Sequence, residues 1–310
     1  MSEAASDFWA VTTYFNPAGY ERRRLNYGLF RKHLKPPLLT VELAFDGDFE
    51  LGPGDAEILV RLSGGDVMWQ KERLLNIAVE KLPPSCAKVA WLDCDVVFED
   101  DDWVARATEQ LEEFPLVQPF SHVHLMPPDW SPGRRPPADC EVVRSPAFLL
   151  AGGMLLSECL GPPSFNIGAA PGYAWAARRD VFDAVDLYDA CIVGGGDSCI
   201  VRAAYGRFDD AVHQQLMNLR RRSHFLEWAT LFHDVVRGQV TYVDGALRHL
   251  WHGSRADRRY KERLERLETY AFDHWADIAA GDKGAWRWSS AKPEMHDYVR
   301  SYFASRREDG

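Results

Sequence analysis

The sequence lacks the features that mark cross-linked or membrane-spanning proteins. Its six cysteines form no CxxC pair and no regular ladder, and they stand at positions 86, 94, 140, 159, 191 and 199. A chain of 310 residues needs no covalent cross-links to hold its core, so we expect reduced thiols. The longest apolar run, Ala147 to Leu156, is about half of what a membrane span requires. We therefore expect a soluble protein without a membrane span.

The sequence also lacks an excess of positive charge. Its formal net charge is -10, which gives no electrostatic support for wholesale nucleic-acid binding. The sequence still allows local basic patches, because Arg220–Arg222 are consecutive and more arginines cluster over Arg255–Arg259. A signal peptide has a basic segment followed by an apolar one. The stretch Met1–Asp7 carries acids and has no such segments, so it does not predict a signal peptide. A cytoplasmic protein is the expectation.

What the sequence does contain is ample material for a large core. Its hydrophobic fraction is 46%, and it has eleven Trp. This length and composition predict one α/β domain with a modest extension. We place the domain at residues 1–255 and a helical, Trp-rich C-terminal extension, packed on that domain, at residues 256–310.

Short apolar runs alternate with amphipathic stretches in the first half of the chain. This pattern is typical of βαβ units, and it predicts a mostly parallel central sheet flanked by helices. Strands are expected at Phe8–Phe15, Leu38–Phe45, Ile58–Leu62, Lys88–Leu92 and Val240–Val243. Helices are expected at about Gly19–His33, Met68–Leu82, Ser198–Tyr205, Asp210–Arg237 (with Gly238 as its C-cap) and Tyr260–Leu267. The Gly- and Pro-rich region Ala147–Gly172 fits no single element.

The central chemical signal is Asp93-Cys94-Asp95, directly after the expected strand Lys88–Leu92. Strand alternation points both carboxylates to the same side, at the strand end where open α/β sheets bind ligands. Such a pair can share a divalent cation with a diphosphate, whose oxygens complete the coordination shell. The same triplet also occurs in plain turns, but its place after a buried strand favours a metal site.

Two histidines, His249 and His252, follow the expected strand Val240–Val243. An imidazole beside carboxylates suits Mn²⁺ better than Mg²⁺, because the softer ion accepts nitrogen ligands. His252 is our candidate ligand, and His249 competes for the same role. A histidine near the end of a strand can also be purely structural.

The segment Gly194-Gly195-Gly196-Asp197 is a third signal. Glycines allow a ligand to approach the backbone closely. Asp197 could accept the proton of an acceptor hydroxyl, which a direct displacement at a sugar requires. Asp197 equally fits the N-cap of the helix Ser198–Tyr205, and the two roles are compatible.

Polar side chains also occur on the helix ahead of the acidic strand. Lys71 and Arg73 could meet phosphate charge, although long cations on a helix usually form a solvated face. Asn76 lies in an otherwise apolar run, so its amide needs hydrogen-bond partners and could hold the Asp93–Asp95 loop in place.

Six segments, spread in order over roughly residues 8 to 260, carry a resemblance to a known family. They are Tyr14–Pro17, Trp69–Ile77, Trp91–Asp95, Gly172–Phe182, Gly195–Asp197 and His252–Arg255. Together they resemble the beta-1,4-galactosyltransferase and chondroitin-polymerase type of GT-A glycosyltransferases. Two departures are Ser198, where the family shows a second acid, and Lys71, where it shows Arg.

The resemblance implies a GT-A, or nucleotide-diphospho-sugar transferase, fold with metal-dependent sugar transfer. The donor would be a nucleotide-sugar, with a UDP-sugar favoured. The transferred sugar would be a hexose, the acceptor would be a hydroxyl group, and the configuration at the anomeric carbon would be inverted. By the same resemblance, Asp93, Asp95 and His252 hold the cation, and Asp197 is the catalytic base. Donor contacts would come from Tyr14, Phe15, Asn16, Lys71, Arg73, Asn76, Asp93, Gly195 and Gly196.

Two other classes of function share parts of this pattern. A nucleotidyltransferase would show a Gly-rich basic loop after its first strand, whereas Thr12–Gly19 holds one glycine. A non-catalytic nucleotide- or carbohydrate-binding module would not need the acids at 93, 95 and 197, although retained residues do not prove activity. The acceptor stays open among a saccharide, a lipid-linked sugar, a protein and a modified DNA base.

Overall fold

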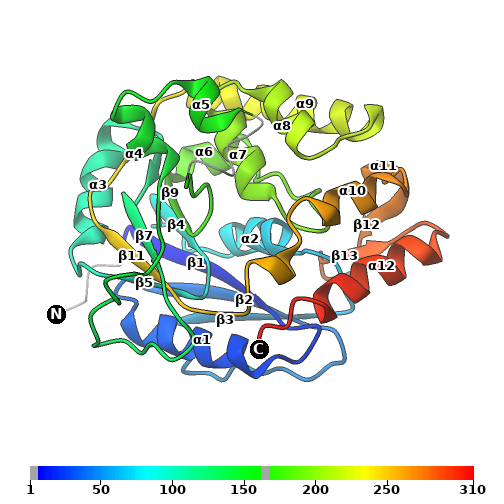
Figure 1. Ribbon diagram of the computed structural model, residues 1–310, viewed down its shortest axis with the longest axis horizontal. Helices are drawn as coiled ribbons and strands as arrows, with labels where there is room; N and C mark the ends of the chain where they lie inside the picture. The colour runs from blue at the N-terminus through cyan, green and yellow to red at the C-terminus, as the bar shows by residue number, and fades with distance from the viewer. Residues whose placement is uncertain (1–5, 162–167) are drawn as a thin grey trace.

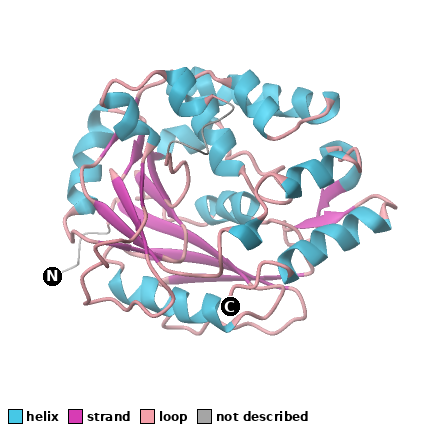
Figure 2. Cartoon of the chain, viewed as in Figure 1, coloured by secondary structure: helices cyan, strands magenta, loops and turns pink. Residues whose placement is uncertain are grey.

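The computed structural model describes residues 6–161 and 168–310. Most of Met1–Asp7 and part of Ala147–Gly172, both considered above, therefore lie outside the described residues. The largest of the sheets has seven strands in the order β10-β6-β9-β4-β1-β2-β3, and Figure 2 draws all strands in magenta. Its strands are β1 (Phe8–Phe15), β2 (Leu38–Ala44), β3 (Ile58–Ser63), β4 (Lys88–Leu92), β6 (Leu116–Gln118), β9 (Ala174–Arg178) and β10 (Val240–Tyr242). The strands expected from the sequence are confirmed with nearly the same bounds.

The central sheet is mostly parallel. β1 runs parallel to β2 and β4, β2 to β3, and β6 to β10. β9 is the exception, because it lies between β4 and β6 and runs antiparallel to both. The α/β class with a mostly parallel central sheet, expected from the alternation of apolar and amphipathic runs, is confirmed.

Helices cover both faces of this sheet (Figure 1). On one face, Phe30 of α1 (Glu21–His33) packs in one cluster with Phe8. On the other, Leu74 of α2 (Lys71–Glu80) packs with Val11. Successive side chains of a strand point to opposite faces, so β1 contributes to both clusters. The other helices are α3 (Trp103–Glu113), α4 (Pro146–Ala151), α5 (Leu156–Leu160), α6 (Arg179–Ala184), α7 (Gly196–Ala204), α8 (Phe208–Gln214), α9 (Leu219–Val236), α10 (Glu262–Glu268), α11 (His274–Asp277) and α12 (Pro293–Ala304), with the 3-10 helix η2 (Ala256–Arg258).

A second sheet of four strands, in the order β5-β11-β7-β8, connects two distant parts of the chain. The strands are β5 (Val96–Phe98), β7 (His122–Leu125), β8 (Val142–Arg144) and β11 (Ala246–His249). β5 begins directly after Asp95, and β11 pairs with it antiparallel, with His249 opposite Val96. The Leu250 amide also donates to the Asp95 carbonyl at 2.8 Å. This pairing fixes the two candidate histidines beside the acidic loop.

The expectation of one helix over Asp210–Arg237 is wrong. The chain forms α8 and α9 instead, separated by a turn at residues 215–218. Leu216 has a φ of 47°, which is left-handed and incompatible with a continuous right-handed helix. Asn218 then starts α9 as its N-cap, because its side chain accepts a hydrogen bond from the Arg221 amide at 3.0 Å.

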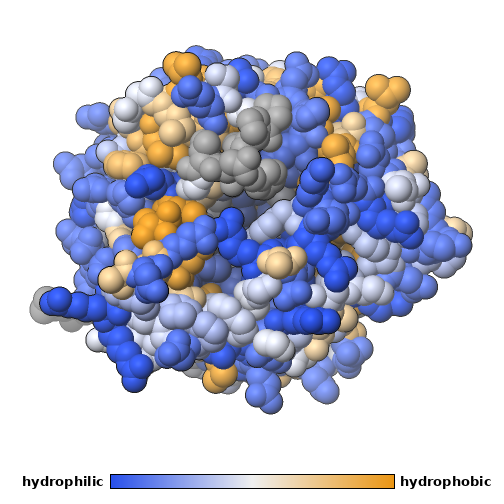
Figure 3. All heavy atoms as spheres, in the orientation of Figure 1, coloured by the Kyte–Doolittle hydropathy of each residue, from blue (hydrophilic) through white to orange (hydrophobic). Residues whose placement is uncertain are grey.

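Residues 256–310 combine short helices with a two-stranded sheet, β12 (Ile278–Ala280) and β13 (Trp286–Trp288). Val299 and Phe303 of α12 are buried in the same cluster as Phe15 of β1. Within the two described ranges, no helix combines the length and the apolarity that crossing a membrane would need. The face of the molecule in Figure 3 is mostly hydrophilic, with smaller apolar groups between.

Candidate functional site

A pocket of about 500 Å³ lies at the carboxyl ends of β1 and β4. This is the edge at which open α/β sheets bind ligands. The residues expected at the site that border this pocket are Phe15, Lys71, Asp93, Asp95, Gly195, Asp197 and His252. The structure thus brings together side chains from segments spread over most of the sequence.

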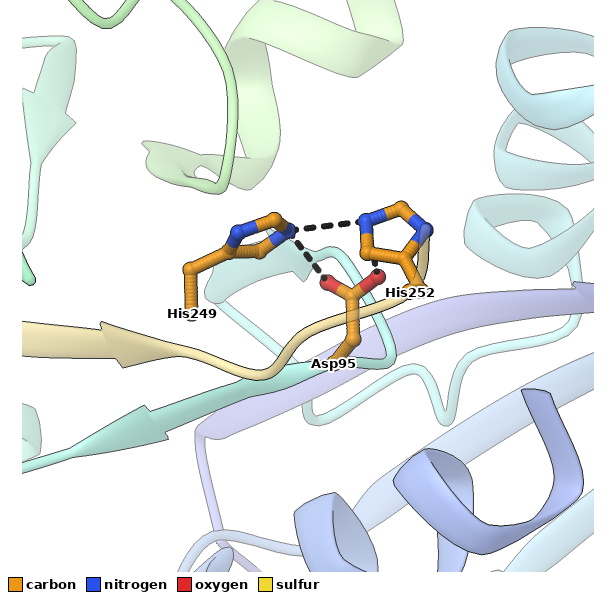
Figure 4. A group of neighbouring side chains, drawn as sticks. All are labelled: Asp95, His249 and His252. Carbon is orange, nitrogen blue, oxygen red and sulfur yellow. Dashed lines mark hydrogen bonds and ion pairs between the residues drawn. The ribbon is translucent and has the colours of Figure 1, made fainter. Parts of the chain in front are cut away.

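Three side chains in the pocket converge as a candidate metal centre: Asp95, His249 and His252. One ligand atom from each lies within 4.8 Å of the others. His252 Nε2 is 3.2 Å from Asp95 Oδ2, and His249 Nε2 is 3.7 Å from Asp95 Oδ1. The two Nε2 atoms are 2.9 Å apart. Figure 4 shows both rings turned toward the same carboxylate, so the geometry does not single out His252 over His249 as the candidate ligand.

The chemistry of this donor set fits a divalent cation. Burial, and then the positive charge of Arg258, lower the pKa of His249 to about 3 and that of His252 well below 6.5, so both rings are neutral and each has one nitrogen lone pair that could bind a cation. Burial and the neighbouring Asp93 raise the pKa of Asp95 to about 7. Asp95 Oδ1 is buried with no hydrogen-bond partner among the described residues. An oxygen left in this way is what a cation would satisfy.

Asp93 faces a different partner. Its Oδ1 lies 2.6 Å from the Lys71 ammonium, and its Oδ2 accepts a hydrogen bond from the Tyr173 amide at 3.2 Å. Lys71 is the first residue of α2 and is only 7% exposed. Burial opposes its charge, but Asp197 and Asp93 together raise the pKa of Lys71 well above its usual range. Lys71 therefore meets carboxylates here, where a phosphate was expected.

Asp197 stands in the first turn of α7 and is held by the same lysine. Its two carboxylate oxygens accept hydrogen bonds from Lys71 Nζ at 3.0 and 3.1 Å. Burial raises the pKa of Asp197, and Lys71 opposes part of this rise. Gly195, with φ 109°, makes the turn before α7, and a Cβ there would lie 2.4 Å from the Gln215 amide. The glycine run thus allows a tight turn that presents Asp197 to the pocket.

Five other residues expected to contact the donor do not border the pocket in the part of the chain that the structure describes. They are Tyr14, Asn16, Arg73, Asn76 and Gly196. Tyr14 donates to Glu50, and Asn16 binds the backbone of Tyr20. Arg73 donates to the Gly284 carbonyl at 2.6 Å, and Gly196 packs against the Glu72 carboxyl.

Asn76 is the buried amide whose partners the sequence left open. It donates to the Leu187 carbonyl at 3.0 Å and accepts from the Leu187 amide at 2.9 Å. It therefore holds the segment after α6, while the Asp93–Asp95 loop has other partners.

Sequence reasoning missed a charged group beside the candidate metal centre. Arg23, Arg306 and Glu308 all border the pocket, and Arg258, noted only as part of a basic cluster, contacts His252. Arg306 and Glu308 follow α12 in a charged stretch that is typical of a solvated surface. Arg23 is one of three consecutive arginines on an amphipathic helix. No motif in the sequence marks these residues as partners.

No protein-family model matches the chain, and no curated protein sequence matches it. Among solved structures, it is similar to glucosyl-3-phosphoglycerate synthase from Mycobacterium tuberculosis in complex with Mn²⁺, UDP and phosphoglyceric acid. That match has 12% identity and a TM-score of 0.43, and it covers 91% of this chain and 86% of that one.

Two further similarities are of the same kind. A mannosyltransferase from Pyrobaculum calidifontis with GDP-Man and Mn²⁺ matches at 11% identity over 84% of this chain and 61% of that one, with a TM-score of 0.41. The catalytic domain of Drosophila beta1,4galactosyltransferase 7 with xylobiose matches at 10% identity over 94% and 98%, with a TM-score of 0.37. Likenesses at this level do not show what this chain binds or catalyses.

Proposed function

We propose that this protein is a metal-dependent glycosyltransferase that moves a sugar from a nucleotide-sugar to a hydroxyl acceptor with inversion. A UDP-sugar is the donor we favour, and Mn²⁺ is the favoured cation. The observation that carries the proposal is the convergence of Asp95, His249 and His252 in the pocket that also contains Asp197. A cation site and a carboxylate base in one pocket are the two parts that such a displacement needs.

The donor side of the pocket is rich in cations. Arg258 and Arg306 border it together with Arg23, while Glu308 is the acid among them. This excess of positive charge suits a diphosphate, whose oxygens accept hydrogen bonds from guanidinium groups. A cation held by Asp95 and the two histidines would act as a Lewis acid that neutralises the departing nucleoside diphosphate.

Asp197 is the proposed base. It would take the proton of the acceptor hydroxyl while the acceptor oxygen bonds to the anomeric carbon. The bond from that carbon to the diphosphate breaks at the same time, so the configuration inverts. Burial raises the pKa of Asp197, which increases its affinity for a proton, and the nearby Lys71 ammonium favours the ionised form that a base needs.

Calorimetric titration with UDP, with and without Mn²⁺, tests the donor site. We expect binding that requires Mn²⁺ and that is lost in Asp95→Asn, while Asp197→Asn binds normally. His33→Gln, at the far end of α1 and bonded to the Leu29 carbonyl, is the matched control. GDP and CDP follow if UDP does not bind.

Hydrolysis of the donor then tests catalysis. We expect Mn²⁺-dependent release of the nucleoside diphosphate from one UDP-sugar, slowed at least 100-fold in Asp197→Asn. Binding without turnover of any donor would favour the non-catalytic module. Failure of every nucleoside diphosphate to bind would overturn the proposed function.

A further inference from the structure

Glu308 is a fully buried acid whose carboxylate is held from two sides. It lies in the segment after α12, and its side chain is 0% exposed. Arg23 grips it with two hydrogen bonds, from Nε at 2.6 Å and from Nη2 at 3.0 Å. Arg306 donates a third from its Nε at 2.6 Å. Burial opposes the charge, but Arg23 and Arg306 hold the pKa of Glu308 well below its usual range. The carboxylate is therefore ionised and fixed.

This carboxylate lies on the side of the His252 ring that is opposite the candidate metal centre. Glu308 Oε1 lies 3.9 Å from His252 Nδ1, whereas His252 Nε2 faces Asp95. When Nε2 binds a cation, the neutral ring must carry its proton on Nδ1, and that proton needs an acceptor. Arg258 also contacts Nδ1, but a guanidinium can only donate. Of these two groups that contact Nδ1, Glu308 is the one that can accept.

We propose that Glu308 is a positioning residue of the metal site, and that it fixes the His252 ring for metal binding by accepting a hydrogen bond from Nδ1–H. The inference rests on the metal-binding part of the proposed function. Nη2 of Arg258 contacts Nδ1 and also donates to the His252 carbonyl at 2.6 Å, so the guanidinium can keep the carbonyl bond when the Nδ1 proton is shared with Glu308.

The backbone around Glu308 is shaped for this contact. Gly253, next to His252, has a φ of 89° and packs flush against the segment. A Cβ at Gly253 would lie 2.7 Å from the Arg307 carbonyl oxygen and 2.9 Å from that of Arg306. A larger residue could not sit there without displacing the segment from the metal loop.

Two sets of hydrogen bonds, the tethers, hold the segment after α12 independently of Glu308, one from Tyr20 just before α1 and one from the first turn of α1. The Tyr20 hydroxyl accepts from the Arg307 amide at 3.0 Å and donates to the Ala304 carbonyl at 2.8 Å. The Asp309 carboxylate accepts from the Arg22 amide at 2.8 Å. These contacts allow the segment to be loosened without altering the Glu308 carboxylate.

The test measures the binding of Mn²⁺ to the full chain in the absence of nucleotide, with electron paramagnetic resonance as the readout. We expect Glu308→Gln to weaken Mn²⁺ binding about 10- to 100-fold, the range for loss of a carboxylate behind a histidine ligand. The double variant Glu308→Gln/Arg306→Met restores the charge balance, and the side-chain oxygen of the introduced glutamine can still accept a hydrogen bond from Arg23, so it should fold. It should bind Mn²⁺ as weakly as the single variant, because positioning is lost in both.

The tether variant Tyr20→Phe/Asp309→Asn is the matched control, and we expect it to change Mn²⁺ affinity less than threefold. Equal weakening in the tether variant and in Glu308→Gln would overturn the inference, because Glu308 would then merely hold the segment. Recovery of Mn²⁺ affinity in Glu308→Gln/Arg306→Met would also overturn it, in favour of net charge. If the wild-type protein binds no Mn²⁺, the metal part of the proposed function fails first; if it binds and Glu308→Gln binds equally well, only this inference fails.

Discussion

The ammonium nitrogen of Lys71 lies 2.6 Å from Oδ1 of Asp93. The same nitrogen bonds both oxygens of Asp197, the proposed base. One buried cation thus holds an aspartate of the acidic loop and the aspartate of the glycine turn, which lie far apart in the sequence. These two carboxylates would repel each other without it.

Replacing this lysine by an uncharged side chain should destabilise the protein. In Lys71→Met, two partly buried carboxylates lose their shared partner, and we expect a loss of about 2 kcal/mol in the free energy of unfolding. This is less than for a fully buried pair, because both aspartates keep some contact with solvent. Urea unfolding measures the change, with the exposed Lys81→Met as control. Equal stability of the two variants would contradict the bridging role.

His249 and His252 should both contribute to Mn²⁺ affinity. Their Nε2 atoms converge on Asp95, so either His249→Ala or His252→Ala should weaken Mn²⁺ binding at least tenfold. Calorimetric titration with Mn²⁺ alone measures this. The His249 ring also packs against Tyr173, at 4.9 Å between centroids. An effect confined to His252→Ala would reduce His249 to that packing role.

The cap between α8 and α9 should have a measurable effect on stability. Asn218→Ala removes the acceptor for the Arg221 amide, and we expect a loss of about 1 kcal/mol in unfolding free energy. Asn218→Asp keeps the acceptor and should retain most of that stability, although it loses the bond from Nδ2 to the Phe272 carbonyl. Thermal unfolding of the three proteins separates these outcomes. A fully stable Asn218→Ala would mean that the turn is set by Leu216 alone.

Stability should fall in mildly acidic solution because of His274. Its ring stacks on His224 at 3.8 Å between centroids, and burial, then His224, lower the pKa of His274 to about 4. Below pH 6.5 the unfolded chain binds a proton that the folded chain refuses until about pH 4. The contribution of His274 is therefore complete above pH 6.5 and is lost as the pH falls through this window.

The corresponding variant is His274→Phe, which removes this proton uptake. Urea unfolding at pH 7.5 and at pH 4.5 gives the stability lost between the two pH values. This loss should be smaller for His274→Phe than for the wild type, because only the wild-type unfolded chain takes up a proton at position 274, near the ordinary histidine pKa of about 6.5. His213→Gln, at an exposed histidine, should leave the difference unchanged. The same pH dependence in His274→Phe and the wild type would exclude His274 as its source.

The central strands could be predicted because each is a continuous buried run between clear breaks. β1 and β4 match their expected bounds, since nearly every residue in them faces a covered sheet surface. The α8–α9 break was missed because the apolar spacing continues through Leu216, while the break depends on one left-handed residue. Periodicity alone does not report that.

Residues of the candidate site could be predicted where a local motif marks them. Asp95 lies in the acidic triplet directly after the buried strand β4, Asp197 follows a run of glycines at the start of α7, and both border the pocket. The joint position of His249 and His252 depends on pairing between β5 and β11, a long-range contact that sequence patterns leave open. The partners of Lys71 and Glu308 are likewise set by tertiary packing.

The antiparallel strand β9 in the middle of the large sheet has a consequence for how the chain can be assembled. In this sheet β6 lies between β10 and β9, and both of these strands follow it in the sequence. During synthesis, β1 to β4 can pair early, but the edges of β4 and β6 stay open until residues 174–178 have emerged. Sheets that close through such late, distant partners fold slowly and expose edges that can pair with other chains. A nascent or partly unfolded molecule would therefore be prone to aggregate at the open edge of β4 that later pairs with β9, next to the acidic loop.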